Sequence, residues 1–364
     1  MKELQHQKPI KFFHPSSLIS TNKEKVLMNV AEYHSNEDIR IKQIAKPSIS
    51  ENEILVSMKA CGICGTDVME WYRKKSAPRI LGHEMSGEVV EIGCNVNTIQ
   101  KHDRVFVSHH VPCFDCYYCN RGNHSACDCL HSGNFFPGGF SEFVRIPENN
   151  VKYGTFVLPQ KISYEEASMI EPMACAVAGQ KMIKLQKNET VIILGSGISG
   201  LTHIQLSKNI GSKVIATDVS KYRLEQSKKF GADYSYHAGD LNIEKIKKIN
   251  NGRLADKVIV CTVNESAIQN AFEYVDKKGS ILFFAVPSEN INIPSIKLWR
   301  NEISIFFSYG AAPDEIKETL QLADEQKIDL KSMVTHSLPL SRIVEGFKLV
   351  SDANESMKVV VTTD

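Results

Sequence analysis

Three residue types that bind metals occur close together in the first third of the chain. The segment CGICGTD carries Cys61 and Cys64, and the segment LGHEMSG places His83 and Glu84 side by side. A thiolate, an imidazole and a carboxylate are common ligands of a catalytic zinc ion, which keeps one coordination position free for solvent or substrate. Taken alone, His83 is more readily explained as a hydrogen-bonded polar residue, so the prediction depends on the combination.

A group of cysteines has the spacing of a structural metal site. Cys113, Cys116, Cys119 and Cys127 form a CxxCxxC sequence that is followed by a fourth cysteine. Four thiolates at such short separations can close a tetrahedron around Zn²⁺ and leave no position open for a substrate. An iron–sulfur cluster also takes four cysteines, but its usual spacings differ. We therefore predict a zinc ion that folds a loop, with Cys129 as a spare thiol.

A glycine-rich motif in the segment 191–218 has the pattern of a dinucleotide site. An apolar run precedes Gly195, Gly197 and Gly200, and a helical pattern and a second apolar run follow them. Glycines at these positions allow a tight turn and the close approach of a pyrophosphate. The phosphates would then meet the start of the helix at Ile198.

The residue that ends this segment indicates which dinucleotide binds. The Asp218 carboxylate can accept hydrogen bonds from the adenine ribose hydroxyls, whereas it would repel a 2′-phosphate. We therefore predict NAD and keep NADP as the alternative, because the basic residues Lys221 and Arg223 follow closely. Arg223 is included among the predicted cofactor contacts, although two basic residues on a helix are more often simply solvated.

The rest of the chain supplies the elements that must position these motifs. Its 364 residues are 42% hydrophobic, which is enough for two domains. Apolar runs over 257–262, 279–286 and 302–310 alternate with helical segments, and this pattern indicates a parallel sheet covered on both faces. The alternation of apolar and polar residues over 53–60 predicts a strand. The segment after Gly310 has a helical pattern, and we expect it to return the chain to the other domain.

Composition limits the partners and the compartment. A net charge of +1 argues against nucleic acid or an anionic membrane as the main partner, and favours a small molecule. No apolar run is long enough for a signal peptide or a membrane span, so we expect a soluble cytoplasmic protein. Disulfides do not persist in that compartment, where clustered cysteines more often bind metal.

Five motifs together resemble one known family. CGICGTD, LGHE, the four spaced cysteines, EPMAC and GSGISG occur in an order and at distances similar to those of the zinc-dependent medium-chain dehydrogenase/reductase (alcohol dehydrogenase) family, closest to its polyol and sugar (sorbitol-type) dehydrogenases. The resemblance begins near Lys25 and implies an α/β fold. A GroES-like β-barrel catalytic domain would span 25–172 and 311–364, a doubly wound Rossmann domain would span 173–310, and residues 1–24 would form an N-terminal extension.

The resemblance also implies roles for individual residues in the catalytic site. Cys64 and His83 would ligate the zinc, with Glu84 and Glu171 as the carboxylates of the same site, and which carboxylate is innermost stays open. Asp67 would orient the histidine ligand. The family uses two zinc ions per chain, one catalytic and one structural.

The implied reaction is hydride transfer from an alcohol to the nicotinamide, with the zinc lowering the pKa of the alcohol. Thr66 would hydrogen-bond the substrate oxygen. Met69 stands where many relatives have a proton-relaying histidine, so the proton must leave through water, the cofactor ribose or Glu84. Ser308 precedes Tyr309 where sorbitol dehydrogenases tend to have an Arg-Tyr pair, which argues against sorbitol itself.

The favoured hypothesis is therefore a zinc- and NAD-dependent dehydrogenase of a polyol, cyclitol or sugar. The first alternative is an L-threonine or simple-alcohol dehydrogenase. The second is a noncatalytic NAD-binding protein, which would be recognised by the loss of zinc ligands. The resemblance further implies a homodimer or homotetramer. Four basic residues after Met69 could meet an anionic group on the substrate, but a solvated loop is the expected role of Arg73, Lys74, Lys75 and Arg79.

Overall fold

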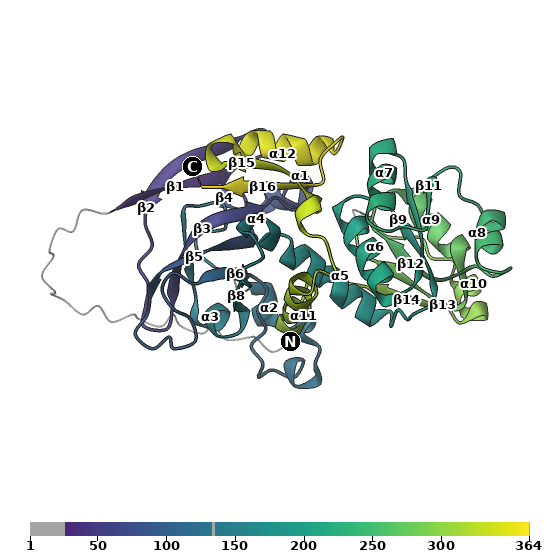
Figure 1. Cartoon of the computed structure of the whole chain (residues 1–364), viewed down its shortest axis with the longest axis horizontal. Helices are drawn as coiled ribbons and strands as arrows, with labels where there is room; N and C mark the ends of the chain where they lie inside the picture. The colour runs from purple at the N-terminus through teal and green to yellow at the C-terminus, as the bar shows by residue number, and fades with distance from the viewer. Residues whose placement is uncertain (1–25, 133–134, 288, 364) are drawn as a thin grey trace, which may run out of the picture.

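The chain folds into two bodies, each built on its own sheet structure (Figure 1). The computed structural model describes residues 26–132, 135–287 and 289–363. The predicted N-terminal extension, residues 1–24, lies outside the described residues. Within the described ranges, none of the helices combines the length and the apolar composition that crossing a membrane requires.

The second body, formed by the middle of the chain, is a six-stranded parallel sheet in the order β11-β10-β9-β12-β13-β14. Alternate residues of its central strand pack on opposite faces: Val191 and Ile193 lie in one core cluster, and Ile192 and Leu194 lie in another. The predicted doubly wound sheet is confirmed. The strands are β9 (Thr190–Leu194), β10 (Lys213–Asp218), β11 (Tyr234–His237), β12 (Ala255–Val260), β13 (Val275–Phe283) and β14 (Ser304–Phe307).

Helices cover both faces of this sheet (Figure 1). The strand order reverses between β9 and β12, and such a switch point opens a crevice at the carboxyl ends of the strands. The helices of this body are α6 (Ile198–Ile210), α7 (Lys221–Lys229), α8 (Ile243–Ile249), α9 (Glu265–Tyr274) and α10 (Ser295–Asn301).

The first body combines a three-stranded sheet, β2-β1-β4, with a seven-stranded sheet, β15-β16-β3-β5-β6-β8, in which β7 also pairs with β3. One of its core clusters includes Val56, Met85 and Phe347. Its strands are β1 (Leu27–Tyr33), β2 (Ile39–Ala45), β3 (Ile54–Gly62), β4 (Arg79–Ile80), β5 (Glu84–Ile92), β6 (Arg104–Ser108), β7 (Phe143–Ile146), β8 (Thr155–Val157), β15 (Val334–Pro339) and β16 (Lys358–Thr362).

The end of the chain returns to the first body, as Figure 1 shows in yellow. Strand β16 pairs antiparallel with β3, with Val360 opposite Gly62. An early strand and the last strand therefore lie side by side in one sheet, although the predicted boundaries at 172/173 and 310/311 stay predictions. The remaining helices are α1 (Glu70–Arg73), α2 (Asp128–Ser132), α3 (Glu148–Gly154), α4 (Tyr164–Ala167), α5 (Ile170–Met182), α11 (Pro313–Asp324) and α12 (Ile343–Asp352).

Candidate active site

The predicted zinc ligands meet where two neighbouring strands end and begin. Strands β3 and β5 are antiparallel, with Gly62 opposite Glu84, so the residues just after β3 lie beside the first residues of β5. As a result, ligand atoms of Cys64, His83 and Glu84 all lie within 4.8 Å of one another. Pairing across a sheet, and not proximity in sequence, assembles this group.

The Glu84 carboxylate carries the observation that best fits a metal ion. Its side chain is only 1% exposed, and one oxygen, Oε2, contacts the buried Lys358 ammonium group. The other oxygen, Oε1, is buried and has no hydrogen-bond partner in the described part of the chain. An unpartnered buried carboxylate oxygen is unfavourable unless something binds it. A thiol, an imidazole and this oxygen form a donor set that suits zinc.

Asp67 contacts two of the three predicted ligands, Cys64 and His83, and holds them in place. Its buried carboxylate accepts a hydrogen bond from the Cys64 backbone N–H at 3.1 Å, and its Oδ1 lies 3.5 Å from His83 Nδ1. Burial raises the pKa of Asp67, but the charges of His83 and Arg73 outweigh burial and lower it. Because Nδ1 faces Asp67, Nε2 is the ring nitrogen left to ligate a metal.

Arg73 lies in the site and not in solvent, so the expectation of a solvated loop was wrong for this residue. Its side chain is only 14% exposed and contacts both Thr66 and Asp67. Lys74, Lys75 and Arg79 are exposed, as expected. The sequence carried no signal that separates Arg73 from its basic neighbours, because which of them turns inward depends on the path of the short helix α1.

Glu171, in the first turn of α5, lies beside the three-ligand group but does not belong to it. Its carboxylate is within 4.8 Å of ligand atoms of His109 and His110, and it accepts a hydrogen bond from the Cys175 thiol at 3.3 Å. Burial raises the pKa of Glu171, and the nearby charge of Glu84 adds to this effect. This grouping favours Glu84 as the innermost carboxylate.

His109 and His110 are site residues that the sequence analysis missed. The ring of His109 lies 4.8 Å from that of His83 and 3.6 Å from that of His110, which in turn is 5.4 Å from the ring of Tyr309. Burial lowers the pKa of His110 to about 3, so its imidazole is neutral near neutral pH. The Nδ1 atoms of both histidines are buried without a hydrogen-bond partner among the described residues. The HH pair just before the clustered cysteines was the available signal.

The four clustered cysteines have the geometry of a tetrahedral metal site. The Cys113 sulfur lies 3.9 Å from that of Cys119 and 3.6 Å from that of Cys127. Zinc–sulfur bonds of ~2.3 Å give a tetrahedron with edges of about 3.8 Å, whereas a disulfide needs ~2.05 Å. Burial raises the pKa of Cys127, but hydrogen bonds from the backbone of Cys113 and Leu130 lower it to about 6, which favours the thiolate that a metal binds.

Removing one of these sulfurs is expected to release one metal ion without abolishing turnover. We predict that Cys116→Ser lowers the zinc content by one ion per chain and makes the loop around α2 sensitive to protease, because the loop has only a small apolar cluster of its own. Metal analysis and limited proteolysis measure this. The exposed Cys129, which is outside the four-sulfur group, provides the matched control Cys129→Ser, and an equal loss of zinc there would contradict the assignment.

The glycine-rich turn after β9 has the shape that a pyrophosphate needs. Gly195 has φ of +93°, a conformation that side chains rarely adopt. A Cβ atom on Gly200 would lie 2.0 Å from the carbonyl oxygen of Gly195, so only glycine lets α6 pack on the turn. No described side chain caps the start of α6 at Gly197, and its N–H groups are available to an anion. These residues fit a dinucleotide.

Asp218 ends β10 beside this turn. Its carboxylate accepts hydrogen bonds from the backbone N–H groups of Ser196 at 2.8 Å and Ser220 at 2.9 Å, so it is held in one orientation. Arg223 Nη1 lies 3.9 Å from the same carboxylate, and Nη2 donates to the carbonyl oxygen of Ala353 at 3.1 Å. The structure therefore brings the predicted acidic and basic cofactor contacts together.

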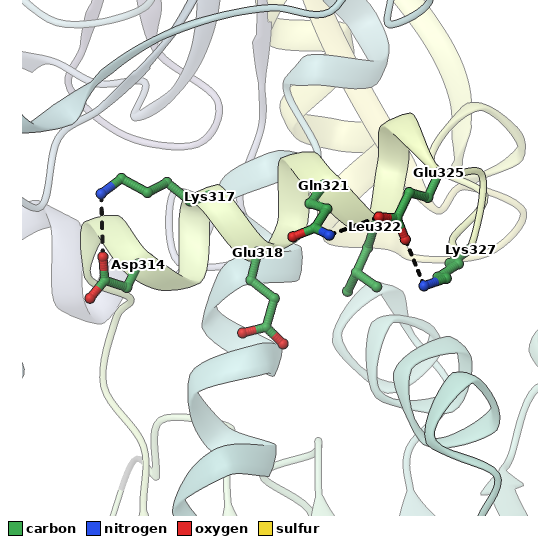
Figure 2. A pocket seen from close by; sticks show the side chains of 7 residues that line it. All are labelled: Asp314, Lys317, Glu318, Gln321, Leu322, Glu325 and Lys327. Carbon is green, nitrogen blue, oxygen red and sulfur yellow. Dashed lines mark hydrogen bonds and ion pairs between the residues drawn. The ribbon is translucent and has the colours of Figure 1, made fainter.

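A hollow of about 500 Å³ lies elsewhere, along helix α11 (Figure 2). Figure 2 shows contacts between neighbouring polar side chains along the helix: Asp314 with Lys317, and Glu325 with both Gln321 and Lys327. None of the predicted site residues lines it. We interpret it as a solvated helix face.

Two family models match the chain. The model described as alcohol dehydrogenase GroES-like domain matches residues 50–154, in the first body. The model described as zinc-binding dehydrogenase matches residues 199–325, mainly in the second body.

Named relatives and solved structures match almost the whole chain. A sorbitol dehydrogenase of Bacillus subtilis (strain 168) is 30% identical and covers 92% of this chain and 97% of its own. An L-galactonate-5-dehydrogenase of Escherichia coli (strain K12) is 28% identical, covering 92% and 99%. The crystal structure of a protein described as a short chain alcohol dehydrogenase from E. coli CFT073, complexed with the cofactor NADH, matches with a TM-score of 0.83 at 25% identity, covering 92% and 99%.

Proposed function

The chain belongs to the zinc-binding alcohol dehydrogenase family, and from that premise we propose that it oxidises a secondary alcohol of a polyol, cyclitol or sugar with NAD as the hydride acceptor. One observation carries the proposal. Cys64, His83 and Glu84 converge with a buried carboxylate oxygen that lacks a partner. A noncatalytic relative would be expected to have lost such a donor set.

Some residues of this chain would then bind the zinc ion, and others would orient its ligands and the substrate. Cys64, His83 and Glu84 would hold the zinc, with Glu171 beside them. When bound, zinc supplies the Lewis acidity that allows an alcohol to ionise near neutral pH, and NAD supplies the hydride acceptor. Asp67 fixes the tautomer and orientation of His83. The hydroxyl of Thr66, which lies 3.3 Å from the Cys64 sulfur, is the donor placed to hold the substrate oxygen.

Three observations support a substrate with several hydroxyl groups. The wall beside the zinc ligands is polar, since it contains His109, His110 and Glu171. Both imidazoles have an unpartnered Nδ1 that can accept or donate a hydrogen bond. The relatives named as sorbitol and L-galactonate dehydrogenases carry names of polyhydroxylated substrates. Because Ser308 stands where sorbitol dehydrogenases tend to have the arginine of an Arg-Tyr pair, we propose a substrate other than sorbitol.

We propose that the protein assembles as a homodimer or homotetramer through the second body. Strand β14 is at the edge of its sheet. On the preceding helix, α10, Ile296 is 79% and Trp299 is 80% exposed. A strand edge with exposed apolar side chains beside it is typical of an interface between subunits. We also propose the cytoplasm as the compartment, because its reducing conditions keep thiols such as those of the four clustered cysteines able to bind metal.

A substrate panel tests the proposed function. Purified protein of measured zinc content would be mixed with NAD and with polyols, inositols, sugar phosphates, L-threonine or primary alcohols, and NADH formation would be followed by absorbance. Turnover of a polyol, cyclitol or sugar is the expected result. Turnover of threonine or a primary alcohol alone would replace the proposed substrate class, and silence across the panel at full zinc content would contradict it.

The identity of the cofactor can be tested at Asp218. We expect Asp218→Asn to reduce the preference for NAD over NADP by about tenfold or more, because a like charge near a 2′-phosphate costs about 1–3 kcal/mol. The amide oxygen can accept only one of the two backbone hydrogen bonds that Asp218 accepts, so the thermal unfolding of the variant is measured alongside. Dissociation constants for both cofactors measure the effect. Glu225→Gln, on the exposed side of α7, is the matched control, and an unchanged preference in Asp218→Asn would place the ribose elsewhere.

A further inference from the structure

We propose that Arg73 is a positioning residue that fixes the direction in which the Thr66 hydroxyl group donates its hydrogen. The proposal rests on the proposed function, because it concerns how a substrate oxygen is held. It also concerns the loop in which Met69 stands in place of a histidine. A thioether neither donates a hydrogen bond nor carries a proton, and its sulfur is only a weak acceptor, so Met69 is a poor group for orienting a neighbouring hydroxyl group.

The Arg73 guanidinium binds Thr66 and Asp67 through three contacts. Nη2 donates to Thr66 Oγ1 at 2.9 Å and to Asp67 Oδ1 at 3.1 Å, and Nε donates to the Thr66 carbonyl oxygen at 3.0 Å. Its own backbone N–H is bonded to the carbonyl oxygen of Met69 at 3.0 Å, which closes the turn of α1. Two of the contacts fix the Thr66 backbone and side chain at the same time, which a point charge could not do.

The contact with Oγ1 determines what the Thr66 hydroxyl can do. A guanidinium group has donors only, so Oγ1 must be the acceptor, and the hydroxyl hydrogen must point to another atom. The Cys64 sulfur, 3.3 Å away, accepts it in this structure. The hydrogen is therefore directed toward the zinc-ligand group, where a substrate oxygen would need a donor. Without Arg73 the hydroxyl could rotate and accept instead.

A purely structural role for Arg73 makes a different prediction. Asp67 is fully buried, and Arg73 could serve only to neutralise its charge beside His83. In that case the loss of Arg73 would act through the zinc ligands, and would be independent of whether residue 66 carries a hydroxyl group. If Arg73 acts through Thr66, its loss has no further effect once that hydroxyl is gone.

A sulfoxide oxygen distinguishes these roles, because it can only accept a hydrogen bond. The probe is dimethyl sulfoxide, titrated into the complex of the zinc-loaded protein with NADH and followed by NADH fluorescence. We expect Thr66→Val and Arg73→Met each to weaken its binding by about five- to tenfold. The double variant should bind no more weakly than the weaker single variant. Lys74→Met removes an exposed charge next to Arg73 and should bind as the wild type does.

Several results would overturn the proposal. The first is that Arg73→Met binds dimethyl sulfoxide as tightly as the wild type does. The second is that the effects of the two single variants multiply in the double variant. The third is that the wild-type complex does not bind dimethyl sulfoxide. If Arg73→Met loses zinc, Arg73→Lys decides, because lysine keeps the charge for Asp67 without the planar fork. A wild-type affinity in Arg73→Lys would then refute the positioning role. The two proposals can fail separately. If no compound of the substrate panel is turned over, but the four proteins bind dimethyl sulfoxide as expected, the proposed substrate class is rejected and the role of Arg73 is supported.

Discussion

Cys64→Ser is expected to reduce turnover by at least about a thousandfold, because a neutral hydroxyl group is a poor zinc ligand and the reaction depends on the metal's acidity. The zinc content should fall by one ion per chain. The melting temperature should stay close to that of the metal-free wild type, since Cys64 lies after the end of β3 and outside the core cluster that includes Val56. Turnover with the best substrate of the panel, metal analysis and thermal unfolding measure the three quantities.

Cys116→Ser provides the informative comparison, because it also removes one sulfur and one metal ion. The two variants should show opposite patterns: Cys64→Ser keeps an intact loop and loses turnover, whereas Cys116→Ser opens the loop and keeps measurable turnover. Full zinc content and wild-type turnover in Cys64→Ser would mean that the chemistry takes place elsewhere. Loss of both metal ions in either variant would mean that the two sites do not fold independently.

Lys358→Met is expected to lower the free energy of unfolding by about 3–5 kcal/mol, because it leaves the buried Glu84 carboxylate without its charge partner. Lys358 is 2% exposed, contacts Glu84 Oε2, and donates to the carbonyl oxygen of Ile63 at 3.3 Å. For a body of this size the melting temperature should fall by roughly 10 °C. Thermal unfolding of metal-free and zinc-loaded protein measures it, with the larger fall expected in the metal-free form.

A second substitution tests whether the buried charge is the cause. In Lys358→Met/Glu84→Gln the carboxylate is neutralised, so part of the lost stability should return even though one more native side chain has been changed. Lys348, which is exposed on α12, gives the control Lys348→Met, which should unfold as the wild type does. A double variant less stable than Lys358→Met would show that packing of the lysine stem, and not its charge, stabilises this sheet.

Much of the fold and part of the site could be predicted from the sequence because they depend on local patterns. The run Val191–Leu194 and the glycines after it specify a strand, a turn and a helix within a few residues, and β9 and α6 form there. The spacing of Cys113, Cys116, Cys119 and Cys127 restricts their sulfurs to a small volume, and they are clustered in the structure. In both cases the residues that act together are neighbours in the chain.

Tertiary structure alone decided the rest of the site, because its contacts join distant segments. Lys358 reaches Glu84 across 274 residues, only because β16 returns to pair with β3. Tyr309, at the end of the second body, meets His110 in the first. The direction of Arg73 follows from the turn of α1 and not from its residue type. The sequence by itself therefore determined which chemistry this protein can do, whereas the pairing of distant strands decided which side chains surround the reacting atoms.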